Sequence, residues 1–314
     1  MTHIVIAGAG AFGTALAVTL DRAGRSVTLV GRDVEEIART RLNPRLPSIQ
    51  LSESIHVSPS LSVTGDDILL LAVPMQSLSG YLAETRPAPK VAVACCKGVD
   101  LKTGTGPSAI IGDKLDVPSA VLTGPSFAAD IAKGLPTALT LATDHAALAA
   151  DLQASLSTDT LRLYRSDDPV GAELGGALKN VIAIACGITM GAGLGESARA
   201  ALMTRGYAEM LRLSLALGAQ RDTLAGLSGF GDLTLTCTSH QSRNFTFGYA
   251  LGQGQRPAEG VTVEGRATAQ AVAALAKRHK LDMPITQAVN DLLDKSLTLT
   301  EVLEHLLSRP LRKE

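Results

Sequence analysis

Short apolar runs alternate with longer helical patterns through the first half of the chain. The runs that predict strands are HIVIA (3–7), SVTLV (26–30), DILLLAV (67–73), KVAVAC (90–95), SAVLTG (119–124), TALTLAT (137–143) and TLRLYR (160–165). Strands that alternate with helical patterns are typical of βαβ units. This half of the chain therefore predicts an α/β domain with a mostly parallel sheet.

The pattern changes after RSDDPVG (165–171), where long Ala- and Leu-rich segments replace the strands. The spacing of their apolar residues predicts helices over 168–190 and 196–217, and Pro169 suits the first turn of the earlier one. A chain of 314 residues is also long for a single core. We expect an α/β domain over residues 1–166 and an all-helical C-terminal domain over 167–314.

Composition limits the class of protein. The chain is 46% hydrophobic and 19% charged with a net charge of −1, which predicts a globular protein that binds no nucleic acid. We expect no apolar run of the roughly 18 residues that span a membrane and no signal peptide, and hence a cytoplasmic protein. The four cysteines show no C-x-x-C spacing, so we expect buried, reduced thiols and no metal site.

A glycine-rich turn, GAGAFG (8–13), joins the first strand to a helical segment. It has the form G-x-G-x-x-G, in which Gly8 permits a tight turn, Gly10 lets a pyrophosphate approach the backbone, and Gly13 lets helix and strand pack closely. The spacing alone also fits a turn that binds nothing. Its place at the opening of the sheet favours a dinucleotide cofactor.

The second strand ends in GRD (31–33), where an NAD-selective site normally has an acidic residue. Arg32 at this position favours a 2′-phosphate and therefore NADP, whereas Asp33 leaves a ribose contact and NAD possible. A solvated turn is the alternative to both.

Two further strands end in residues suited to bind an anion. Lys97 follows the run KVAVACC, and Gly124 and Ser126 lie in the strand-to-helix turn LTGPSFAAD (122–130). The carboxyl ends of parallel strands form the ligand-binding edge of open α/β sheets, and free N–H groups at a helix start hold anions. Each segment alone also fits an ordinary turn.

The helical half contains a lysine in an otherwise apolar segment, ELGGALKNVIAIACGI (173–188). Lys179 either extends its ammonium to solvent along an apolar stem or serves chemistry, because burying a lone charge is costly.

A polar, glycine-rich segment follows at 226–248 and contains Arg243 among hydroxyl and amide side chains. Arginine in such company suits phosphate recognition, and an exposed loop with a helix start is the alternative. Further on, Glu264 precedes Gly265 as a candidate helix cap or ribose contact.

Taken together, the motifs resemble those of the bacterial-type NAD(P)-dependent glycerol-3-phosphate dehydrogenases over nearly the whole chain. The matching segments are GAGAFGTALA, CCKGVD, LTGPSFA, GGALKNVIAIACGI, AALMTRGYAEM, GFGDLTLTCTSHQSRN and TVEG. The resemblance implies a Rossmann domain followed by a helical domain, a homodimer, and reversible reduction of dihydroxyacetone phosphate to sn-glycerol 3-phosphate for glycerophospholipid synthesis.

The resemblance also implies roles for individual residues. Lys179 is similar to the family's general acid/base, with Asn180, Asp232 and Thr236 beside it. The substrate-binding positions implied are Lys97, Gly124, Ser126, Lys179, Asp232, Ser242, Arg243 and Asn244. The positions implied for NADPH/NADP or NADH/NAD are Gly8, Gly10, Ala11, Phe12, Gly13, Arg32, Lys97, Ala128, Arg243, Thr262 and Glu264.

Three residues depart from the family pattern. Cys96 stands where the family usually has threonine, and Ser197 stands where it usually has asparagine. Because serine and asparagine are comparable helix N-caps, we expect Ser197 still to begin the helix that follows. Thr262 replaces a more typical aliphatic residue, which affects only the cofactor side.

The resemblance implies a mechanism in which the nicotinamide supplies a hydride and the protein supplies a proton. Lys179 would donate that proton during reduction and take it back during oxidation. Two rivals remain: a ketopantoate or 3-hydroxyacid reductase, whose substrate carries a carboxylate, and a nucleotide-sensing module without chemistry. The SRN segment (242–244) favours a phosphorylated substrate over the first, and Lys179, Asn180 and Asp232 argue against the second.

Overall fold

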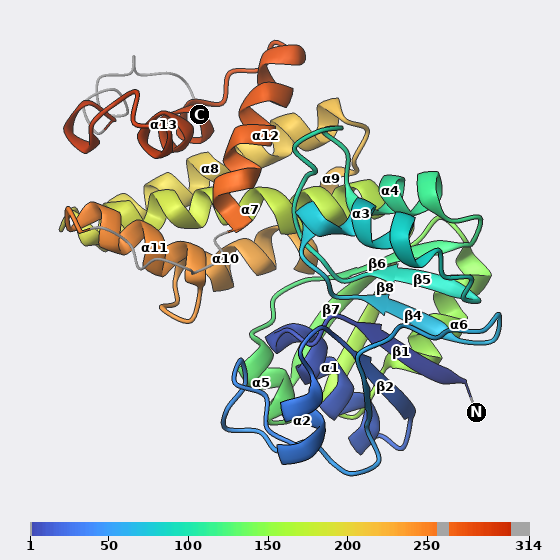
Figure 1. The fold of residues 1–314 in the computed structure, drawn as a ribbon. Coiled ribbons are helices and arrows are strands. Elements are labelled where there is room, and N and C mark those ends of the chain that lie inside the picture. The colour runs from blue at the N-terminus through green and yellow to red at the C-terminus, as the bar shows by residue number, and fades with distance from the viewer. Residues whose placement is uncertain (1, 256–263, 303–314) are drawn as a thin grey trace. The chain divides into compact units, whose positions relative to one another are not determined.

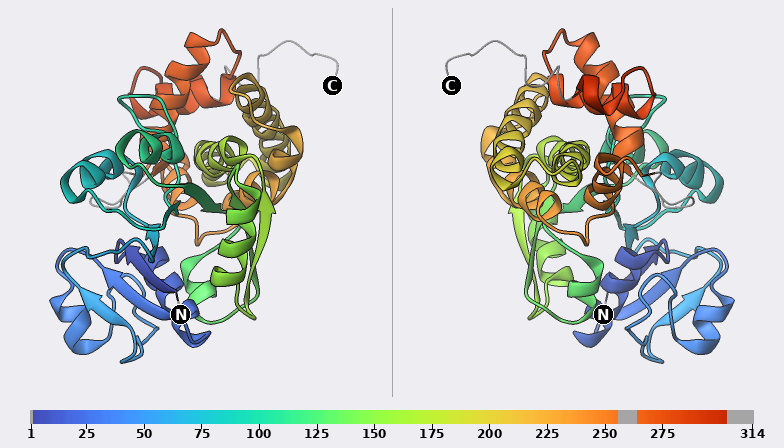
Figure 2. Two further views of the ribbon diagram at one scale, coloured as in Figure 1. Left: turned by 90° about the vertical axis from the view of Figure 1, so that its right-hand side faces the viewer. Right: turned by 90° about the vertical axis from the view of Figure 1, so that its left-hand side faces the viewer.

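A computed structural model describes residues 2–255 and 264–302 of the chain. It contains two compact units: unit 1 comprises residues 1–97 and 105–173, and unit 2 comprises 98–104 and 174–314 (Figure 1; Figure 2). The domain boundary expected from the sequence, between residues 166 and 167, lies just before helix α7 (Pro169–Gly191).

Unit 1 is built on an eight-stranded sheet of order β3-β2-β1-β4-β5-β6-β7-β8. The strands are β1 (His3–Ala7), β2 (Ser26–Val30), β3 (His56–Ser58), β4 (Ile68–Leu71), β5 (Val91–Ala94), β6 (Ser119–Thr123), β7 (Thr137–Ala142) and β8 (Leu161–Ser166). All neighbours are parallel except β6 and β7. The predicted mostly parallel sheet is confirmed, and its order reverses between β1 and β4, where doubly wound sheets bind ligands.

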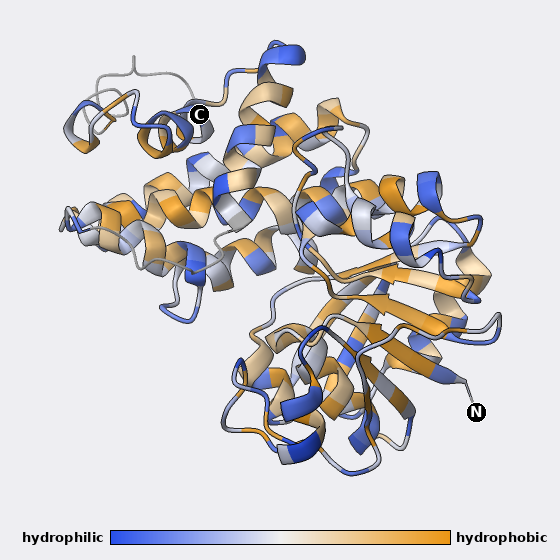
Figure 3. Cartoon of the chain, viewed as in Figure 1, coloured by the Kyte–Doolittle hydropathy of each residue, from blue (hydrophilic) through white to orange (hydrophobic). Residues whose placement is uncertain are grey.

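Both faces of this sheet are buried, because parallel sheets are covered by helices on each side. Ile4 and Ile6 of β1 belong to one apolar core, and the alternate residues Val5 and Ala7 belong to another. Figure 3 shows the central strands as the most hydrophobic part of this unit. The helices are α1 (Ala11–Arg22), α2 (Glu35–Thr40), α3 (Met75–Thr85), α4 (Pro107–Lys114), α5 (Ala128–Ala132) and α6 (Ala146–Leu156).

Unit 2 is helical in its described residues, as predicted. Besides most of α7 it contains α8 (Glu196–Ala216), α9 (Arg221–Ala225), a single π-helical turn η1 (Leu227–Gly231), α10 (Asp232–Cys237), α11 (Arg243–Gly252), α12 (Glu264–Arg278) and α13 (Pro284–Leu293). Residues 98–104 of the chain also belong here, because Val99 is buried in the core of this unit.

Helix α7 is the buried centre of unit 2. Its 23 residues are long and apolar enough to cross a membrane, so the expectation that no apolar segment reaches this length was wrong. Of its most apolar 18-residue stretch, 89% is nonetheless buried inside the protein, which marks α7 as a core helix. The expectation was wrong because it rested on short uninterrupted apolar runs, whereas few charged residues interrupt the longer segment Pro169–Gly191.

Glycines let α7 and α11 approach each other very closely. A Cβ added at Gly187 or Gly191 of α7 would collide with backbone carbonyls of α11, and one at Gly248 or Gly252 of α11 would collide with those of α7. Each helix therefore carries a pair of glycines four residues apart on the face turned to the other helix, and no side chain separates the two backbones there.

The four cysteines are free and buried, as predicted. Burial raises the pKa of the Cys95 thiol to about 12 and also raises the pKa of the Cys237 thiol well above its usual value. Both thiols therefore stay protonated and unreactive near neutral pH.

Candidate active site

The glycine-rich turn between β1 and α1 has the geometry that its sequence predicts. Gly8 has a φ of +120°, and a Cβ on it would lie 2.5 Å from the carbonyl oxygen of Ala72. A Cβ on Gly13 would collide with the Gly8 carbonyl, so helix and turn pack directly on each other. Gly10 differs, because a Cβ there meets no atom within 4 Å of it in the described residues.

The first turn of α1 suits a phosphate group. Its N-cap is Gly10, and no side chain of the described residues caps the helix N-terminus. The first N–H groups of a helix have no partner within the helix and attract anions, and Ala11 and Phe12 are the first residues of α1. The open space at Gly10 and these N–H groups fit the pyrophosphate of a dinucleotide.

Arg32 and Asp33 lie at the carboxyl end of β2, and both side chains are exposed. Asp33 has a φ of +51°, and the N–H of Gly31 donates to the carbonyl of Ser58 at the end of β3. These residues therefore form a tight turn at the edge of the sheet where the adenosine half of a dinucleotide binds.

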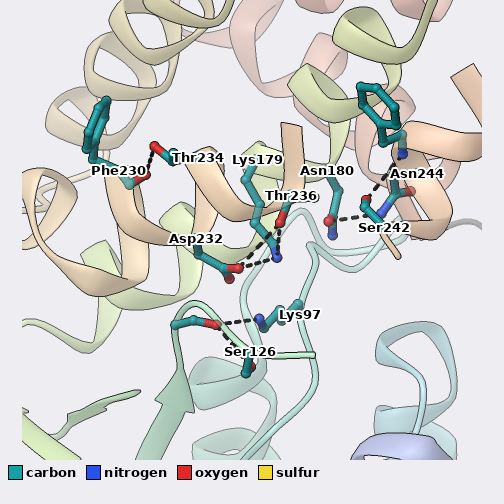
Figure 4. A network of polar contacts seen from close by, with 12 residues as sticks. Lys97, Ser126, Lys179, Asn180, Phe230, Asp232, Thr234, Thr236, Ser242 and Asn244 are labelled. Atoms are coloured by element: carbon teal, nitrogen blue, oxygen red, sulfur yellow. Dashed lines mark hydrogen bonds and ion pairs between the residues drawn. The ribbon is translucent and has the colours of Figure 1, made fainter. Parts of the chain in front are cut away.

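Three predicted residues of unit 1 meet around one carbonyl group. Lys97 Nζ donates to the Gly124 carbonyl oxygen at 3.1 Å, and Ser126 Oγ donates to the same oxygen at 3.1 Å (Figure 4). Gly124 has a φ of +137° and Ala128 begins α5 just beyond it. The turn after β6 thus holds the Lys97 ammonium at the carboxyl edge of the sheet.

In unit 2, Lys179 is buried in an ion pair. Its Nζ donates to Asp232 Oδ1 at 2.6 Å and to Thr236 Oγ1 at 2.8 Å, and its side chain is only 8% exposed (Figure 4). Asp232 itself is fully buried. The ammonium therefore does not reach solvent, and the paired carboxylate offsets the cost of burying it.

The π-helical turn η1 places Asp232 opposite Lys179. The N–H of Gly231 donates to the carbonyl of Gly226, five residues earlier, and Asp232 then begins α10. A Cβ on Gly175 would collide with the Ser228 carbonyl, so η1 packs directly on α7. Because Gly175 and Lys179 are four residues apart, they share that face of α7.

Asn180, the next residue, joins a second polar chain. Asn244 Nδ2 donates to Asn180 Oδ1 at 2.9 Å, while Asn244 Oδ1 accepts from the N–H of Gly265 at 3.0 Å. The Nδ2 atom of Asn180 is buried and has no protein partner in the described part of the chain. A buried amide donor without a partner is expensive, which suggests that a ligand accepts from it.

The SRN segment is both a helix start and a candidate phosphate site. Ser242 is the N-cap of α11, and its Oγ accepts from the N–H of Phe245 at 3.2 Å. Arg243 is the first residue of α11 and is exposed, so its guanidinium can reach a ligand.

Some predicted residues lie elsewhere. Thr262 is outside the described residues, and of Glu264 only the backbone, at the start of α12, is described. The expected N-cap role of Ser197 was wrong: Gly195 is the N-cap, and Ser197 lies inside the first turn of α8. Gly195 takes this position because its φ of +86° is unfavourable for serine. The described residues contain no cluster of three or more side chains of the kinds that bind metals.

The fold and these residues together define a class of protein. A nicotinamide cofactor transfers a hydride and leaves the proton to the protein, so such an enzyme combines a dinucleotide-binding sheet with a side chain that handles protons. Unit 1 contains the sheet and its glycine turn, and unit 2 contains the lysine. The class is that of nicotinamide-dependent oxidoreductases with a Rossmann domain and a helical domain.

Comparison with known proteins identifies the family. A model of the NAD-dependent glycerol-3-phosphate dehydrogenase N-terminus matches residues 3–149, and a model of the C-terminus of the same family matches residues 168–304. The chain belongs to this family and is an NAD(P)-dependent enzyme of it.

Relatives resemble the chain over its full length. Glycerol-3-phosphate dehydrogenase [NAD(P)+] of Cereibacter sphaeroides is 59% identical over 99% of this chain and 100% of its own, and that of Ruegeria sp. is 56% identical over 99% of each. A crystal structure of glycerol-3-phosphate dehydrogenase from Coxiella burnetii superposes with a TM-score of 0.93, at 38% identity, and covers 98% of this chain and 99% of its own.

Proposed function

We propose that this protein reversibly reduces dihydroxyacetone phosphate to sn-glycerol 3-phosphate with NADPH or NADH, and so supplies the backbone of glycerophospholipids. The observation that carries the proposal is the buried contact of Lys179 with Asp232 and Thr236. A buried ammonium that donates to a carboxylate and to a hydroxyl is positioned to give a proton to a ketone oxygen. The family membership of the chain supports the same reaction.

Lys179 acts as the general acid during reduction. NAD(P)H, when bound, supplies the hydride, and the Lys179 Nζ gives its proton to the carbonyl oxygen of the substrate. The Asp232 carboxylate and the Thr236 hydroxyl accept from the Lys179 ammonium and hold it in one position. In the reverse reaction the neutral amine of Lys179 takes the proton of the alcohol.

Other residues bind the substrate and the cofactor in this proposal. Arg243 pairs with the substrate phosphate, because a guanidinium suits bidentate phosphate binding, and Ser242 and Asn244 flank it. Lys97, held by the Gly124 carbonyl beside Ser126, adds positive charge. Asn180 uses its Nδ2, which has no protein partner among the described residues, to bind substrate or cofactor.

We also propose that the protein is a homodimer, as its sequence resemblance implies, and that it is cytoplasmic. The Arg32 guanidinium favours NADPH because it can bind the 2′-phosphate of that cofactor, and Asp33 permits NADH because it can contact the ribose. Nothing in the described residues indicates insertion into a membrane, since α7 is enclosed by the protein.

The test separates catalysis from the stability of the ion pair. Lys179→Met should lower turnover of dihydroxyacetone phosphate by about 10²–10⁴, but it also removes the ammonium that pairs with the buried Asp232 carboxylate, and breaking a buried ion pair typically costs about 3–5 kcal/mol. We therefore expect the double variant Lys179→Met/Asp232→Asn to regain thermal stability without regaining activity. Lys90→Met, at an exposed lysine, is the control.

The measurements are oxidation of NADPH followed at 340 nm, NADPH binding and thermal unfolding. Substantial turnover in a folded variant without Lys179 would contradict the proposed acid/base role. Preference of the wild-type protein for 2-oxo acids would instead favour the ketopantoate-type reaction.

A further inference from the structure

A loop between α2 and β3 reaches the glycine-rich turn. The loop runs from Arg41, which ends α2, to Leu51, whose N–H donates to the Arg41 carbonyl oxygen at 2.8 Å. The Arg41 guanidinium donates to the carbonyl oxygens of Ser52 and Ile55 at 2.6 and 3.1 Å. The loop is therefore closed at its base, and its Leu46 and Ile49 belong to an apolar core of unit 1.

Asn43 projects from this loop and is fully buried. Its Nδ2 donates to the Ala9 carbonyl oxygen at 3.1 Å and to Thr14 Oγ1 at 2.6 Å, and its Oδ1 accepts from the N–H of Arg45 at 2.9 Å. The orientation of the amide is unambiguous, because a carbonyl can only accept and an N–H can only donate. One side chain thus joins the turn before α1, the first turn of α1 and its own loop.

The contact with Ala9 fixes a peptide plane inside the glycine-rich turn. In a trans peptide the C=O and the following N–H point in opposite directions, and no cis peptide bond occurs in the described residues. Holding the Ala9 carbonyl toward Asn43 therefore turns the N–H of Gly10 away from it. Gly10 is also the residue above which the structure leaves open space.

Glycine makes this restraint necessary. The turn contains Gly8 and Gly10, whose backbones have more accessible conformations than those of other residues, so the peptide between Ala9 and Gly10 needs an external contact to stay in one orientation. A flipped peptide would present a carbonyl oxygen where an anionic ligand needs an N–H group.

We propose that Asn43 is a positioning residue of the dinucleotide site: its amide orients the peptide bond between Ala9 and Gly10 so that the Gly10 N–H is available to the pyrophosphate. This inference rests on the proposed use of NAD(P)H. Asn43 does not take part in proton transfer, and its effect is on cofactor affinity alone.

The experiment compares Asn43→Asp with Thr14→Val. Asn43→Asp keeps the acceptor for Arg45 but loses both donors and places a carboxylate oxygen against the Ala9 carbonyl. Thr14→Val removes a hydroxyl from the same buried cluster and leaves the Ala9 contact intact. Asn43→Ser, which removes the Nδ2 amide and shortens the side chain without adding charge, serves if the aspartate variant does not fold.

NADPH binding is measured by calorimetry without substrate, and steady-state kinetics give the remaining constants. We expect Asn43→Asp or Asn43→Ser to raise the dissociation constant of NADPH about tenfold or more, and Thr14→Val to raise it less than threefold. At saturating NADPH, kcat and the KM for dihydroxyacetone phosphate should stay within about twofold of wild type.

Equal effects of the Asn43 and Thr14 variants on NADPH affinity would overturn the inference, because they would reflect general loosening of the turn. Unchanged affinity in a folded Asn43 variant would overturn it as well. A wild-type protein that binds no NADPH would instead contradict the proposed function, so the two failures are distinguishable.

Discussion

Gly8 and Gly124 of unit 1 serve a different purpose from Gly187 and Gly248 of unit 2. In unit 1, Gly8 and Gly124 follow strands and adopt φ values of +120° and +137°, which other residues rarely adopt. In unit 2, Gly187 of α7 and Gly248 of α11 lie inside helices, where glycine is ordinarily unfavourable, and each faces the backbone of the other helix. The first use depends on backbone conformation and the second on the missing side chain.

The difference shows for which glycines the structural role can be predicted from the sequence. A glycine between a strand and a helix has a local signal, because its neighbours already predict the turn. A glycine within a helix is justified only by its partner helix, which is distant in the sequence. Substitution by alanine tests both uses, since it adds one methyl group and little else.

The largest effect is expected inside unit 2. Gly248→Ala places a methyl group against the Ile184 carbonyl of α7, so the helices must separate along their contact. We expect a loss of roughly 4 kcal/mol or more in the free energy of unfolding, at the upper end of the costs of overpacking. Urea denaturation measures it.

Gly112→Ala in α4 is the matched control for this substitution, because a Cβ there meets no atom within 4 Å in the described residues. It should stabilise the protein by about 0.5–1 kcal/mol, the usual gain from replacing an exposed helical glycine. Similar losses in both variants would show that the contact between α7 and α11 has no special importance.

One helix in each unit begins in the same way, with a proline at its start and a buried glutamate that binds the N–H groups of its first turn. Pro107 begins α4 and Pro284 begins α13, and in each helix a buried glutamate from another helix accepts from the backbone of the first turn. The N–H of Ser108 donates to Glu173 Oε1 at 2.5 Å, and the N–H of Ile285 donates to Glu209 Oε1 at 2.7 Å. Burial raises the pKa of both carboxyls, and that of Glu173 to about 7.

A dependence of stability on pH follows from Glu173. The pKa of Glu173 is higher in the folded protein than its ordinary 4.5, so protonation of this carboxyl stabilises the folded state. This stabilisation is fully present below pH 4.5 and is lost as the pH rises through about 7. Relative to Glu173→Gln, the wild-type protein should lose up to about 3 kcal/mol between pH 4.5 and pH 8.

Glutamine retains the acceptor for Ser108 but cannot ionise, which makes this variant the reference for denaturation at several pH values. Glu209→Gln should show a change of the same sign in unit 2, because burial also raises the pKa of Glu209. A constant difference between wild type and Glu173→Gln from pH 4.5 to pH 8 would show that Glu173 keeps one protonation state.

The smallest effect is expected at Gly10, where alanine should cost affinity and not stability. Gly10 has a φ of −77°, which alanine adopts readily, and its Cβ would meet open space. In the proposed binding mode the pyrophosphate occupies that space, so we expect Gly10→Ala to weaken NADPH binding about tenfold, or about 1.4 kcal/mol, with unchanged thermal unfolding. Loss of stability with normal NADPH binding would place Gly10 with the glycines of unit 2.

Much of the fold could be predicted because its elements have strong local signals. The seven apolar runs that predicted strands all form strands, and α7 and α8 begin and end within one residue of the predicted bounds. Strand β3 (His56–Ser58) was missed, because it is three residues long, lies at the sheet edge and lacks an alternating apolar pattern. The π-helical turn (Leu227–Gly231) was not predicted, since its glycines and serine conceal its helical character.

The residues of the candidate site could be predicted from the sequence, but the contacts between them could not. Lys179 and Asp232 are 53 positions apart, and only the packing of η1 on Gly175 of α7 brings them within 2.6 Å. Asn43 was missed because an asparagine before a proline is an ordinary turn signal. Its function depends on Ala9 and Thr14, which no local pattern links to it.

Residues 98–104 belong to unit 2, although the residues before and after them in the sequence belong to unit 1. This arrangement affects the order in which the core of unit 2 can form during synthesis. Val99 lies in the core of unit 2, and Gly104 lies beside Leu275 of α12. During synthesis on the ribosome this short segment emerges about 70 residues before Leu174, the next residue of this core, and about 170 residues before Leu275. A fragment that starts at residue 167 would therefore lack one piece of its own core, and supplying residues 98–104 as a separate peptide would be the way to restore it.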